Sequence, residues 1–392
     1  MNKLICGDNL EELKKIEKES IDLIYIDPPF FSNKQYEIIW RDEAETRSFE
    51  DRWEGGIEHY ISWMRPRVEA MYEVLKPTGS FYLHCDWYAN AHLRIMLDEI
   101  FGENNFQNEI IWCYKTGGAT ERRFGRKHDT IFFYSKTPKY KFIPQKEKSY
   151  MMHEYGFKKS DFQKDEKGQY AWVIAKDWWE IPAIGSATKE RLGYPTQKPE
   201  ALLEKIIKAS SDKGDIILDS FCGCGTTLAE AQKLGRKWIG IDISPTAIKL
   251  IERRVNKLGI KKDVDYIVTG TPTTIKDLLE LKPFEFQNWV IDTLGAKHSR
   301  KKIGDMGLDG YFVKDIFHNN TGIQVKQSED IGRNVIDNFK SALERAKYKE
   351  GIVVAFSFGK GAYEEVARLK NAGEIDIKLV TVEDLLHKKL KL

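Results

Sequence analysis

Apolar residues in the first two thirds of the chain follow two alternating patterns. Short apolar runs closed by Asp, Gly or Pro predict strands, and apolar positions three or four residues apart predict helices. The expected strands are 4–6, 22–26, 80–84, 110–114, 130–134, 216–218 and 237–241. The expected helices lie within 10–16, 57–75, 202–207, 226–234 and 248–258. This alternation predicts an α/β fold with a mostly parallel sheet and helices on both faces.

Local signals mark several ends of these elements. Asn9 is expected to cap the first helix, and Ser244 with Pro245 to begin the last one. Residues 76–79, Lys-Pro-Thr-Gly, are expected to separate a helix from the strand at 80–84. Pro28 and Pro29 must end the strand at 22–26, because proline cannot continue a central strand.

The pattern changes near residue 283. Helical spacing is expected at 285–295 and 336–346, and short strands at 310–313, 322–326, 352–356 and 377–382. We therefore predict a larger domain over 1–275 and a second, smaller α/β domain over 283–392, which is an ordinary domain size.

Composition narrows the class of protein. The 392 residues are 41% hydrophobic and 31% charged, as in folded globular proteins, and no apolar run is long enough to span a bilayer. Five cysteines show no disulfide-like spacing. These features predict a cytoplasmic protein with no membrane association.

Basic charge is concentrated in one segment. Residues 112–160 hold 12 Lys and Arg against 4 Asp and Glu, so this segment carries +8 while the whole chain carries only +2. Aromatic residues are interleaved with the charges, and such a surface can hold phosphates and stack on bases. A solvated face over ordinary core aromatics explains the segment equally well. The segment 138–192 is less regular than its surroundings.

A glycine-containing turn at 219–227 joins a strand to a helix. Glycines let backbone N–H groups approach a ligand, and Asp242, at the end of the next strand, can accept hydrogen bonds from a ribose. The turn lacks the lysine of a phosphate-binding P-loop. This layout favours a nucleoside; a purely structural turn is the alternative. Cys222 and Cys224 have no companion cluster and are interpreted as small turn residues, not metal ligands.

The strand at 22–26 ends in Asp27-Pro28-Pro29-Phe30. The prolines stiffen the loop and fix two acceptors, the Asp27 carboxylate and the Pro28 carbonyl, beside the Phe30 ring. This set can bind a planar group with an exocyclic amine; a rigid strand-end turn is the alternative.

These motifs together resemble the amino-group DNA methyltransferases. Asp-Pro-Pro-Phe first and Phe221-x-Gly-x-Gly-Thr-Thr227 later is similar to the permuted order of their β class. The matching segments also include Gly7-Asp8, 127–134 and 194–200, so the resemblance covers roughly 1–270. It implies a Rossmann-like fold, S-adenosyl-L-methionine as cofactor and double-stranded DNA as partner.

The resemblance also implies roles for individual residues. Asp27, Pro28, Pro29 and Phe30 would hold and stack on the target base, which must leave the duplex. The implied cofactor residues are Asp8, Thr196, Lys198, Asp219, Phe221, Cys222, Gly223, Gly225, Thr226 and Asp242, with Thr196 and Lys198 closing over the methionine end. The residues expected to bind DNA are Lys115, Arg122, Arg123, Arg126 and Lys127, and 138–192 is the candidate target-recognition region.

Asp27 selects among possible substrates. The family's Asp-Pro-Pro form is associated with N6 of adenine and its Ser-Pro-Pro form with N4 of cytosine. We therefore expect a site-specific adenine-N6 methyltransferase, within a restriction-modification system. N4-cytosine or RNA methylation, and a module that binds cofactor without methylating, are the alternatives. Phe31-Ser32-Asn33 departs from the usual continuation of the motif.

The second domain carries another motif. Asp309, followed by Gln324 and Lys326, resembles the PD-(D/E)XK nucleases and the Mrr-type restriction domain. The resemblance implies a Mg²⁺ ion at Asp309 and a bifunctional methyltransferase and endonuclease, but the Gln lowers the charge at the metal, so an inactive nuclease-like fold is equally consistent. Glu285 or Gln287 is a further candidate ligand. A homodimer and a separate restriction subunit stay open.

Overall fold

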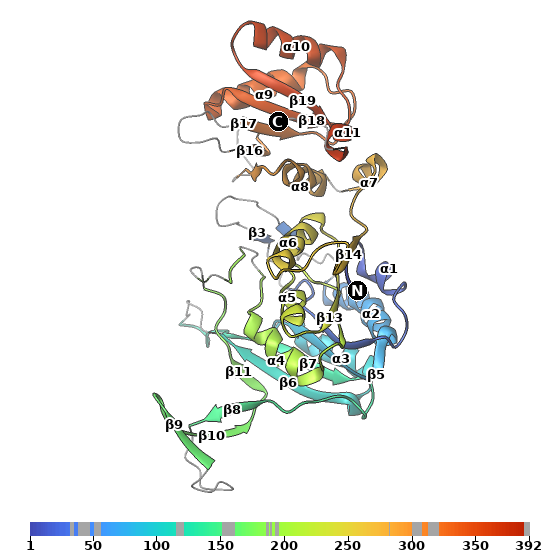
Figure 1. Ribbon diagram of the computed structural model, residues 1–392, viewed down its shortest axis with the longest axis vertical. Coiled ribbons are helices and arrows are strands. Elements are labelled where there is room, and N and C mark those ends of the chain that lie inside the picture. The colour runs from blue at the N-terminus through green and yellow to red at the C-terminus, as the bar shows by residue number, and fades with distance from the viewer. Residues whose placement is uncertain are drawn as a thin grey trace.

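A computed structural model describes most of the chain. It covers residues 1–31, 35–37, 48–50, 56–114, 121–150, 161–185, 188, 190–192, 196–281, 283–299, 308–312 and 321–387. These residues form one large α/β unit, a small antiparallel sheet that projects from it, and a second α/β unit toward the C-terminus (Figure 1).

The large unit is built on a nine-stranded sheet in the order β11-β6-β7-β5-β2-β12-β13-β1-β14. Its strands are β1 (Asn2–Cys6), β2 (Ile21–Ile26), β5 (Leu75–Cys85), β6 (Phe106–Cys113), β7 (His128–Ser135), β11 (Trp178–Glu180), β12 (Ile216–Asp219), β13 (Lys237–Asp242) and β14 (Tyr266–Thr269). All neighbouring strands are parallel except where β7 pairs with β5 and β6. The expectation of a mostly parallel sheet is confirmed.

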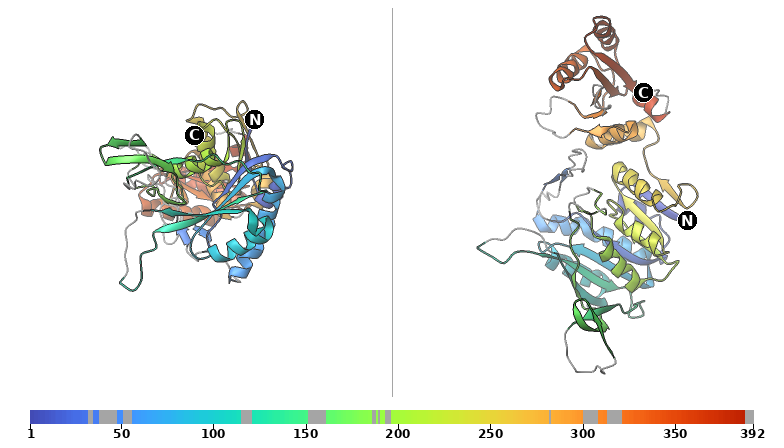
Figure 2. Two further views of the ribbon diagram at one scale, coloured as in Figure 1. Left: turned by 90° about the horizontal axis from the view of Figure 1, so that it is seen from below. Right: turned by 60° about the vertical axis from the view of Figure 1, so that its left-hand side comes forward.

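Helices cover both faces of this sheet (Figure 2). The helices on one face are α1 (Asn9–Leu13), α2 (Gly56–Val74) and α3 (Asn90–Phe101). Those on the other are α4 (Glu200–Ser210), α5 (Thr226–Lys233) and α6 (Pro245–Asn256). Side chains of a strand point alternately to the two faces, so Ile24 packs in the first core while Leu23 and Tyr25 pack in the second.

The first helix begins differently from the expectation. Asp8, not Asn9, is the N-cap of α1, because its carboxylate accepts a hydrogen bond from the Leu10 N–H at 2.9 Å. Asn9 is buried in the first turn and donates its side-chain amide to the Ser220 carbonyl at 2.9 Å. The cap prediction was wrong by one residue because this contact, which is distant in sequence, uses the Asn9 side chain.

The strand expected at 80–84 is longer than predicted. β5 already begins at Leu75, directly after α2. Its pairing with β2 shifts from Leu75 opposite Ile21 to Ser80 opposite Leu23, so residues 76–79 form an irregularity inside the strand instead of a loop before it. Such a bulge accommodates Pro77, which cannot donate to a strand ladder.

The segment 138–192 is more regular than its sequence suggests. It contains a three-stranded antiparallel sheet of β8 (Lys146–Ser149), β10 (Gly168–Ile174) and β9 (Phe162–Asp165), followed by β11. These strands project from the large unit as a separate arm (Figure 1). Their short, charged sequences, such as Lys-Glu-Lys-Ser in β8, hide the strand pattern.

The C-terminal unit has a five-stranded sheet in the order β15-β16-β17-β18-β19. Its strands are β15 (Lys297–His298), β16 (Gly310–Phe312), β17 (Thr321–Val325), β18 (Glu350–Ala355) and β19 (Asp376–Thr381). Its helices are α8 (Pro283–Leu294) and α11 (Val382–Leu386) on one face, and α9 (Arg333–Ala346) and α10 (Lys360–Asn371) on the other. α7 (Ile275–Glu280) precedes them, and the remaining short elements are β3 (Gln35–Glu37), β4 (Ser48–Glu50) and η1 (Glu103–Asn105).

The two units meet where α8 lies against α6. Lys249 on α6 donates to the Thr293 hydroxyl at 2.9 Å and to the Trp289 carbonyl at 3.4 Å. None of the helices in the part of the chain that the structure describes is both long and apolar enough to cross a membrane.

Candidate active site

A cavity of about 230 Å³ opens where the parallel strands β1, β2, β12 and β13 end. Ligands of open α/β sheets bind at this edge. The segments that line the cavity are 7–9, 27–30, 196–198, 219–224 with 226–227, and 242–243, together with Tyr25, Trp63 and Leu203. Almost all the cavity is therefore formed by the motifs singled out in the sequence, although Gly7 and Asp8 are far from Asp242 along the chain.

The glycine turn between β12 and α5 is shaped by two left-handed glycines. Gly223 and Gly225 have φ angles of +47° and +73°, which side chains rarely adopt. A Cβ on Gly225 would lie 2.8 Å from the side chain of Ile251, so a larger residue would displace the turn from α6. The turn therefore presents its backbone to the cavity.

Asp242 fastens this turn to the next helix. One carboxylate oxygen accepts from the Gly223 N–H at 2.8 Å, and the other accepts from the Ser244 N–H at 2.9 Å. Asp242 lines the cavity, so the role expected from the resemblance, holding a ribose, is compatible with its position.

Asp219 is buried beneath the turn. Its carboxylate accepts from the Thr227 hydroxyl at 2.6 Å and from the Phe221 N–H at 3.1 Å. Burial raises the pKa of Asp219 to about 7; the charges of Asp27 and Asp242 add to the effect, and the two hydrogen bonds oppose it.

The two cysteines of the turn both line the cavity. Cys222 and Cys224 are both buried, and burial raises the pKa of each thiol. Within the described residues, no group of three or more His, Cys, Asp or Glu side chains could hold a metal ion.

Asp8 also lines the cavity, where it is held by a group that the sequence did not indicate. Besides capping α1, its carboxylate pairs with the Arg67 guanidinium at 2.8 Å. Arg67 also donates to the Asn9 side chain at 2.8 Å and stacks 4.0 Å above the Trp63 ring. No motif in the sequence indicated Arg67, which is 58 residues from Asn9.

Asp27 and Lys198 form the ion pair at the centre of the site. The Lys198 ammonium lies 2.5 Å from Asp27 Oδ2 and 4.9 Å from the centre of the Phe30 ring. Asp27 Oδ1 is buried and has no hydrogen-bond partner among the described residues. The structure thus places the Lys198 ammonium on the acidic residue that the sequence marked as catalytic, and Lys198 also lines the cavity. Its expected role at the methionine end of the cofactor stays a prediction.

A buried histidine lies beneath Asp27. His84, fully buried in β5, is 2.9 Å from the Tyr25 hydroxyl and 3.3 Å from Asp129, and its Nδ1 lies 4.0 Å from Asp27 Oδ1. Burial acts to raise the pKa of Asp129, but hydrogen bonds from His84 and Tyr114 and the positive charges nearby outweigh it, so the pKa lies below its usual value. The sequence analysis missed this cluster; the pairing of β5 with β7 brings its members together.

The basic residues expected to bind DNA lie just before β7. Arg122, Arg123 and Arg126 are exposed, and the Arg126 guanidinium stacks 3.2 Å from the ring of Trp87. Lys127 is half-buried, and Lys115 lies outside the described residues.

Thr196, which the resemblance assigned to the cofactor, lines the cavity together with Lys198.

The candidate nuclease residues occupy neighbouring strands of the C-terminal unit. Asp309 directly precedes β16, and its carboxylate accepts from the Val325 N–H at 2.7 Å, between Gln324 and Lys326. Gln324 is buried in β17. Glu285 lies in the first turn of α8, and its charge contributes, after burial and Asp242, to raising the pKa of the Cys6 thiol in β1 to about 12.

Comparison with known proteins decides the family. A family model described as DNA methylase matches residues 21–253, which is more than half of the chain and includes Asp27, Lys198 and the glycine turn. The chain belongs to this DNA methylase family. A second model, described as restriction endonuclease, matches residues 278–388.

Individual relatives agree with this family assignment. The chain is 31% identical over 262 residues to the Type II methyltransferase M.HpaI of Haemophilus parainfluenzae, covering 65% of this chain and 74% of the relative. It is 31% identical over 260 residues to the DNA adenine methyltransferase YhdJ of Escherichia coli strain K12, covering 64% and 82%. Among solved structures, a cytosine-N4-specific PvuII DNA methyltransferase matches with a TM-score of 0.46 and 19% identity, over 65% of this chain and 86% of that one.

Proposed function

We propose that the chain methylates N6 of adenine in double-stranded DNA, using S-adenosyl-L-methionine as methyl donor. The observation that carries the proposal is the buried Asp27 Oδ1, which has no hydrogen-bond partner among the described residues and borders the same cavity as the glycine turn. A hydrogen-bond acceptor left in this state is costly unless a ligand supplies the donor. The adenine amino group is such a donor, and the related YhdJ is named an adenine methyltransferase.

The residues around the cavity fit the proposed cofactor. Among the residues that the structure describes, Asp8, Asp27, Asp219 and Asp242 line it together with the basic Lys198, so its charge suits a sulfonium cation. The left-handed glycines bring backbone N–H groups close to a ligand. When bound there, the cofactor supplies an electrophilic methyl group.

The chain's own residues then activate the target nitrogen. The adenine amino lone pair is delocalised into the ring, and acceptors on both amino hydrogens raise the electron density on nitrogen as the N–C bond forms and the S–C bond breaks. Asp27 Oδ1 and the Pro28 carbonyl are assigned these hydrogens, and Phe30 stacks on the base. This is electrostatic stabilisation by groups already in position. Asp27, which accepts one amino hydrogen, takes the proton that the nitrogen must lose.

The proposal also assigns the domains and the residues that bind DNA. We assign the domains as 1–275 for methylation and 283–392 for the nuclease-like unit, with 138–192 as the target-recognition region. Arg122, Arg123, Arg126 and Lys127 would hold the duplex from which the base is flipped. A cytoplasmic location, a restriction-modification system, a homodimer and a separate restriction subunit belong to the same proposal.

The test is methyl transfer from tritiated S-adenosyl-L-methionine to unmethylated genomic DNA, followed by nucleoside analysis. Wild type is expected to produce labelled N6-methyladenine, and Asp27→Ala none. Label in N4-methylcytosine would overturn the substrate assignment. Cofactor binding without any label would favour a binding module instead of an enzyme.

The match of 278–388 to a restriction endonuclease model favours a second candidate function, Mg²⁺-dependent cleavage of DNA. Asp309 and Gln324 together supply one carboxylate and one amide oxygen, a sparse but adequate donor set for Mg²⁺, which keeps several waters. The ion would supply Lewis-acid chemistry at a phosphate, with Lys326 beside it. Cleavage of unmethylated DNA by wild type but not by Lys326→Ala would establish this activity; no cleavage by wild type would exclude it.

A further inference from the structure

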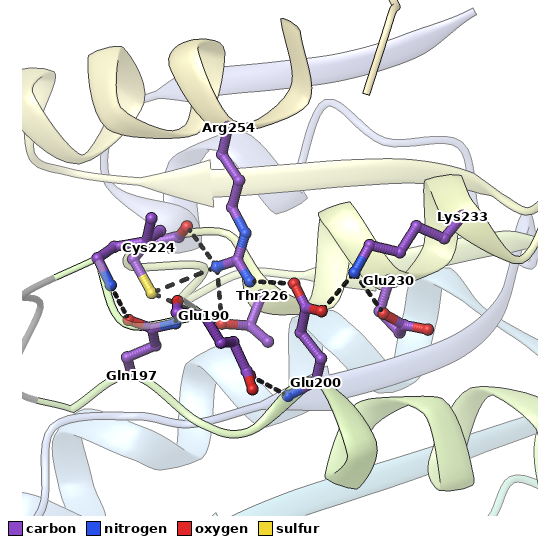
Figure 3. Close-up of polar contacts among 9 residues, drawn as sticks. Glu190, Gln197, Glu200, Cys224, Thr226, Glu230, Lys233 and Arg254 are labelled. Carbon is purple, nitrogen blue, oxygen red and sulfur yellow. Dashed lines mark hydrogen bonds and ion pairs between the residues drawn. The ribbon is translucent and has the colours of Figure 1, made fainter. Parts of the chain in front are cut away.

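Arg254 joins two segments that line different sides of the cavity. It lies on the last turn of α6 and is almost fully buried. One guanidinium nitrogen donates to the Cys224 carbonyl at 3.2 Å and to the Thr226 hydroxyl at 3.0 Å, and the other donates to the Glu200 carboxylate at 2.9 Å (Figure 3). Cys224 and Thr226 belong to the glycine turn, whereas Glu200 begins α4.

Glu200 lies next to the segment that carries Lys198. Only Pro199, the N-cap of α4, separates the two residues. Two hydrogen bonds also connect the end of this segment to Glu190. Gln197 donates to the Glu190 carbonyl at 2.7 Å, and the Glu200 N–H donates to the Glu190 carboxylate at 2.6 Å (Figure 3). Glu200 is thus the point where this compact segment is attached to Arg254 and, through it, to the turn.

The Glu200 carboxyl group favours its charged form, which an ion pair with Arg254 requires. Burial acts to raise the pKa of Glu200, but hydrogen bonds from Lys233 and Arg254 outweigh it and lower the pKa. A buried Arg paired on one side with a carboxylate and on the other with a backbone carbonyl has a fixed fork geometry, unlike a Lys at the same place.

We propose that Arg254 is a positioning residue, which by bridging the glycine turn to Glu200 holds segment 196–200 so that the Lys198 ammonium stays on Asp27. The proposal rests on the methyl-transfer function assigned above. It predicts that cofactor binding at the turn and the geometry of the Asp27–Lys198 pair are coupled through one side chain that touches neither substrate.

Five variants separate this role from general support of the fold. Arg254→Met removes the bridge. Glu200→Gln removes the charge of the arm toward Lys198, so that only an amide oxygen is left to accept from Arg254, and it leaves Arg254 on the turn. Lys233→Met removes the other ionic partner of Glu200, and Arg253→Met changes the exposed neighbour of Arg254 on the same helix. Arg254→Lys retains the charge without the fork.

The first measurement is steady-state methylation with saturating S-adenosyl-L-methionine, with cofactor affinity determined by calorimetry. We expect Glu200→Gln to lower kcat about tenfold while changing the cofactor Kd less than threefold, and Arg254→Met to worsen both. Lys233→Met and Arg253→Met should stay within twofold of wild type. Wild-type kcat in Glu200→Gln, or full recovery of kcat in Arg254→Met at saturating cofactor, would overturn the proposal.

The second measurement does not depend on activity. Acetylation of Lys198 by an N-hydroxysuccinimide ester, followed by peptide mass spectrometry on the ligand-free protein, reports whether the ammonium is still protected. Its rate should rise at least tenfold in Arg254→Met and Glu200→Gln and less in Arg254→Lys, while the half-buried Lys208 on α4, which pairs with Glu204, reacts equally in all variants. Unchanged Lys198 reactivity would exclude the bridge. A wild type that protects Lys198 yet transfers no methyl group would contradict the proposed function alone.

Discussion

Asp27 and Asp309 are strand-end aspartates at the centres of two candidate sites, and they are used in different ways. Asp27 keeps one carboxylate oxygen without a hydrogen-bond partner among the described residues, at the edge of a cavity. Asp309 instead accepts from the Val325 N–H at 2.7 Å, and its own N–H donates to the Ile323 carbonyl at 2.8 Å, so it is bonded to β17 at two points.

The difference shows what a substrate site requires beyond the right residue type. An acceptor that is already satisfied by a neighbouring strand stabilises the fold, whereas a buried acceptor without a donor favours binding of a ligand that brings one. On this criterion the methyltransferase site is ready for its substrate in the described structure. At the nuclease-like site, the Asp309 carboxylate already accepts from the strand that carries Gln324.

The largest expected effect is that of Asp27→Asn on methyl transfer. The amide keeps the shape of the side chain but replaces one acceptor oxygen with a donor, so kcat should fall about 10²–10³-fold, as when one stabilising group is removed from a preorganised site. Asp309→Asn should leave methyl transfer within twofold of wild type. Tritium incorporation into DNA measures both variants. Equal losses in the two variants would mean that the sites are not independent.

A smaller effect concerns the pH dependence of stability. The pKa of Asp219 is raised to about 7 in the folded protein, so between pH 4 and 7 the folded state binds more protons at this site than the unfolded state. Its contribution to the free energy of unfolding therefore falls as the pH rises through this window, by about 2 kcal/mol between pH 5 and pH 7.

Asp219→Asn removes this titration but retains an acceptor for the Phe221 N–H. Urea unfolding of the ligand-free protein at pH 5 and pH 7 should show a loss of stability in wild type that is about 2 kcal/mol greater than in the variant. The same loss in both proteins would contradict the raised pKa. The exposed Asp212 offers a matched control, because Asp212→Asn should behave as wild type.

A third prediction concerns stacking on the target base. Phe30→Leu keeps an apolar side chain beside Lys198 but removes the aromatic face, which should lower kcat/KM for DNA about tenfold with little change in cofactor affinity. Phe142→Leu alters an exposed aromatic of the basic segment and should lower kcat/KM for DNA less than about threefold. A larger loss in Phe142→Leu would move base recognition away from the Asp27 loop.

Several parts of this architecture could be predicted from sequence because their signals are local. The alternation of strands and helices, the Ser244 cap, the glycine turn and the Asp-Pro-Pro-Phe loop each depend on neighbouring residues. The pairing of Asp27 with Lys198, 171 residues away, and the bridge from Arg254 to Glu200 could not, since they arise from packing of distant segments. The small sheet of β8, β9 and β10 was missed because its short, charged strands have little apolar pattern.

The smallest effect distinguishes the two units as DNA-binding surfaces. Arg123 is exposed just before β7, and Arg345 is exposed on α9 of the C-terminal unit. If the methyltransferase unit holds the duplex, Arg123→Ala should weaken DNA binding a few-fold and reduce the slope of log K against log salt by about 1, because one phosphate contact is lost. Arg345→Ala should leave both quantities unchanged in fluorescence anisotropy titrations at several salt concentrations. The opposite result would place the principal DNA contact on the nuclease-like unit, and not on the unit that contains Asp27.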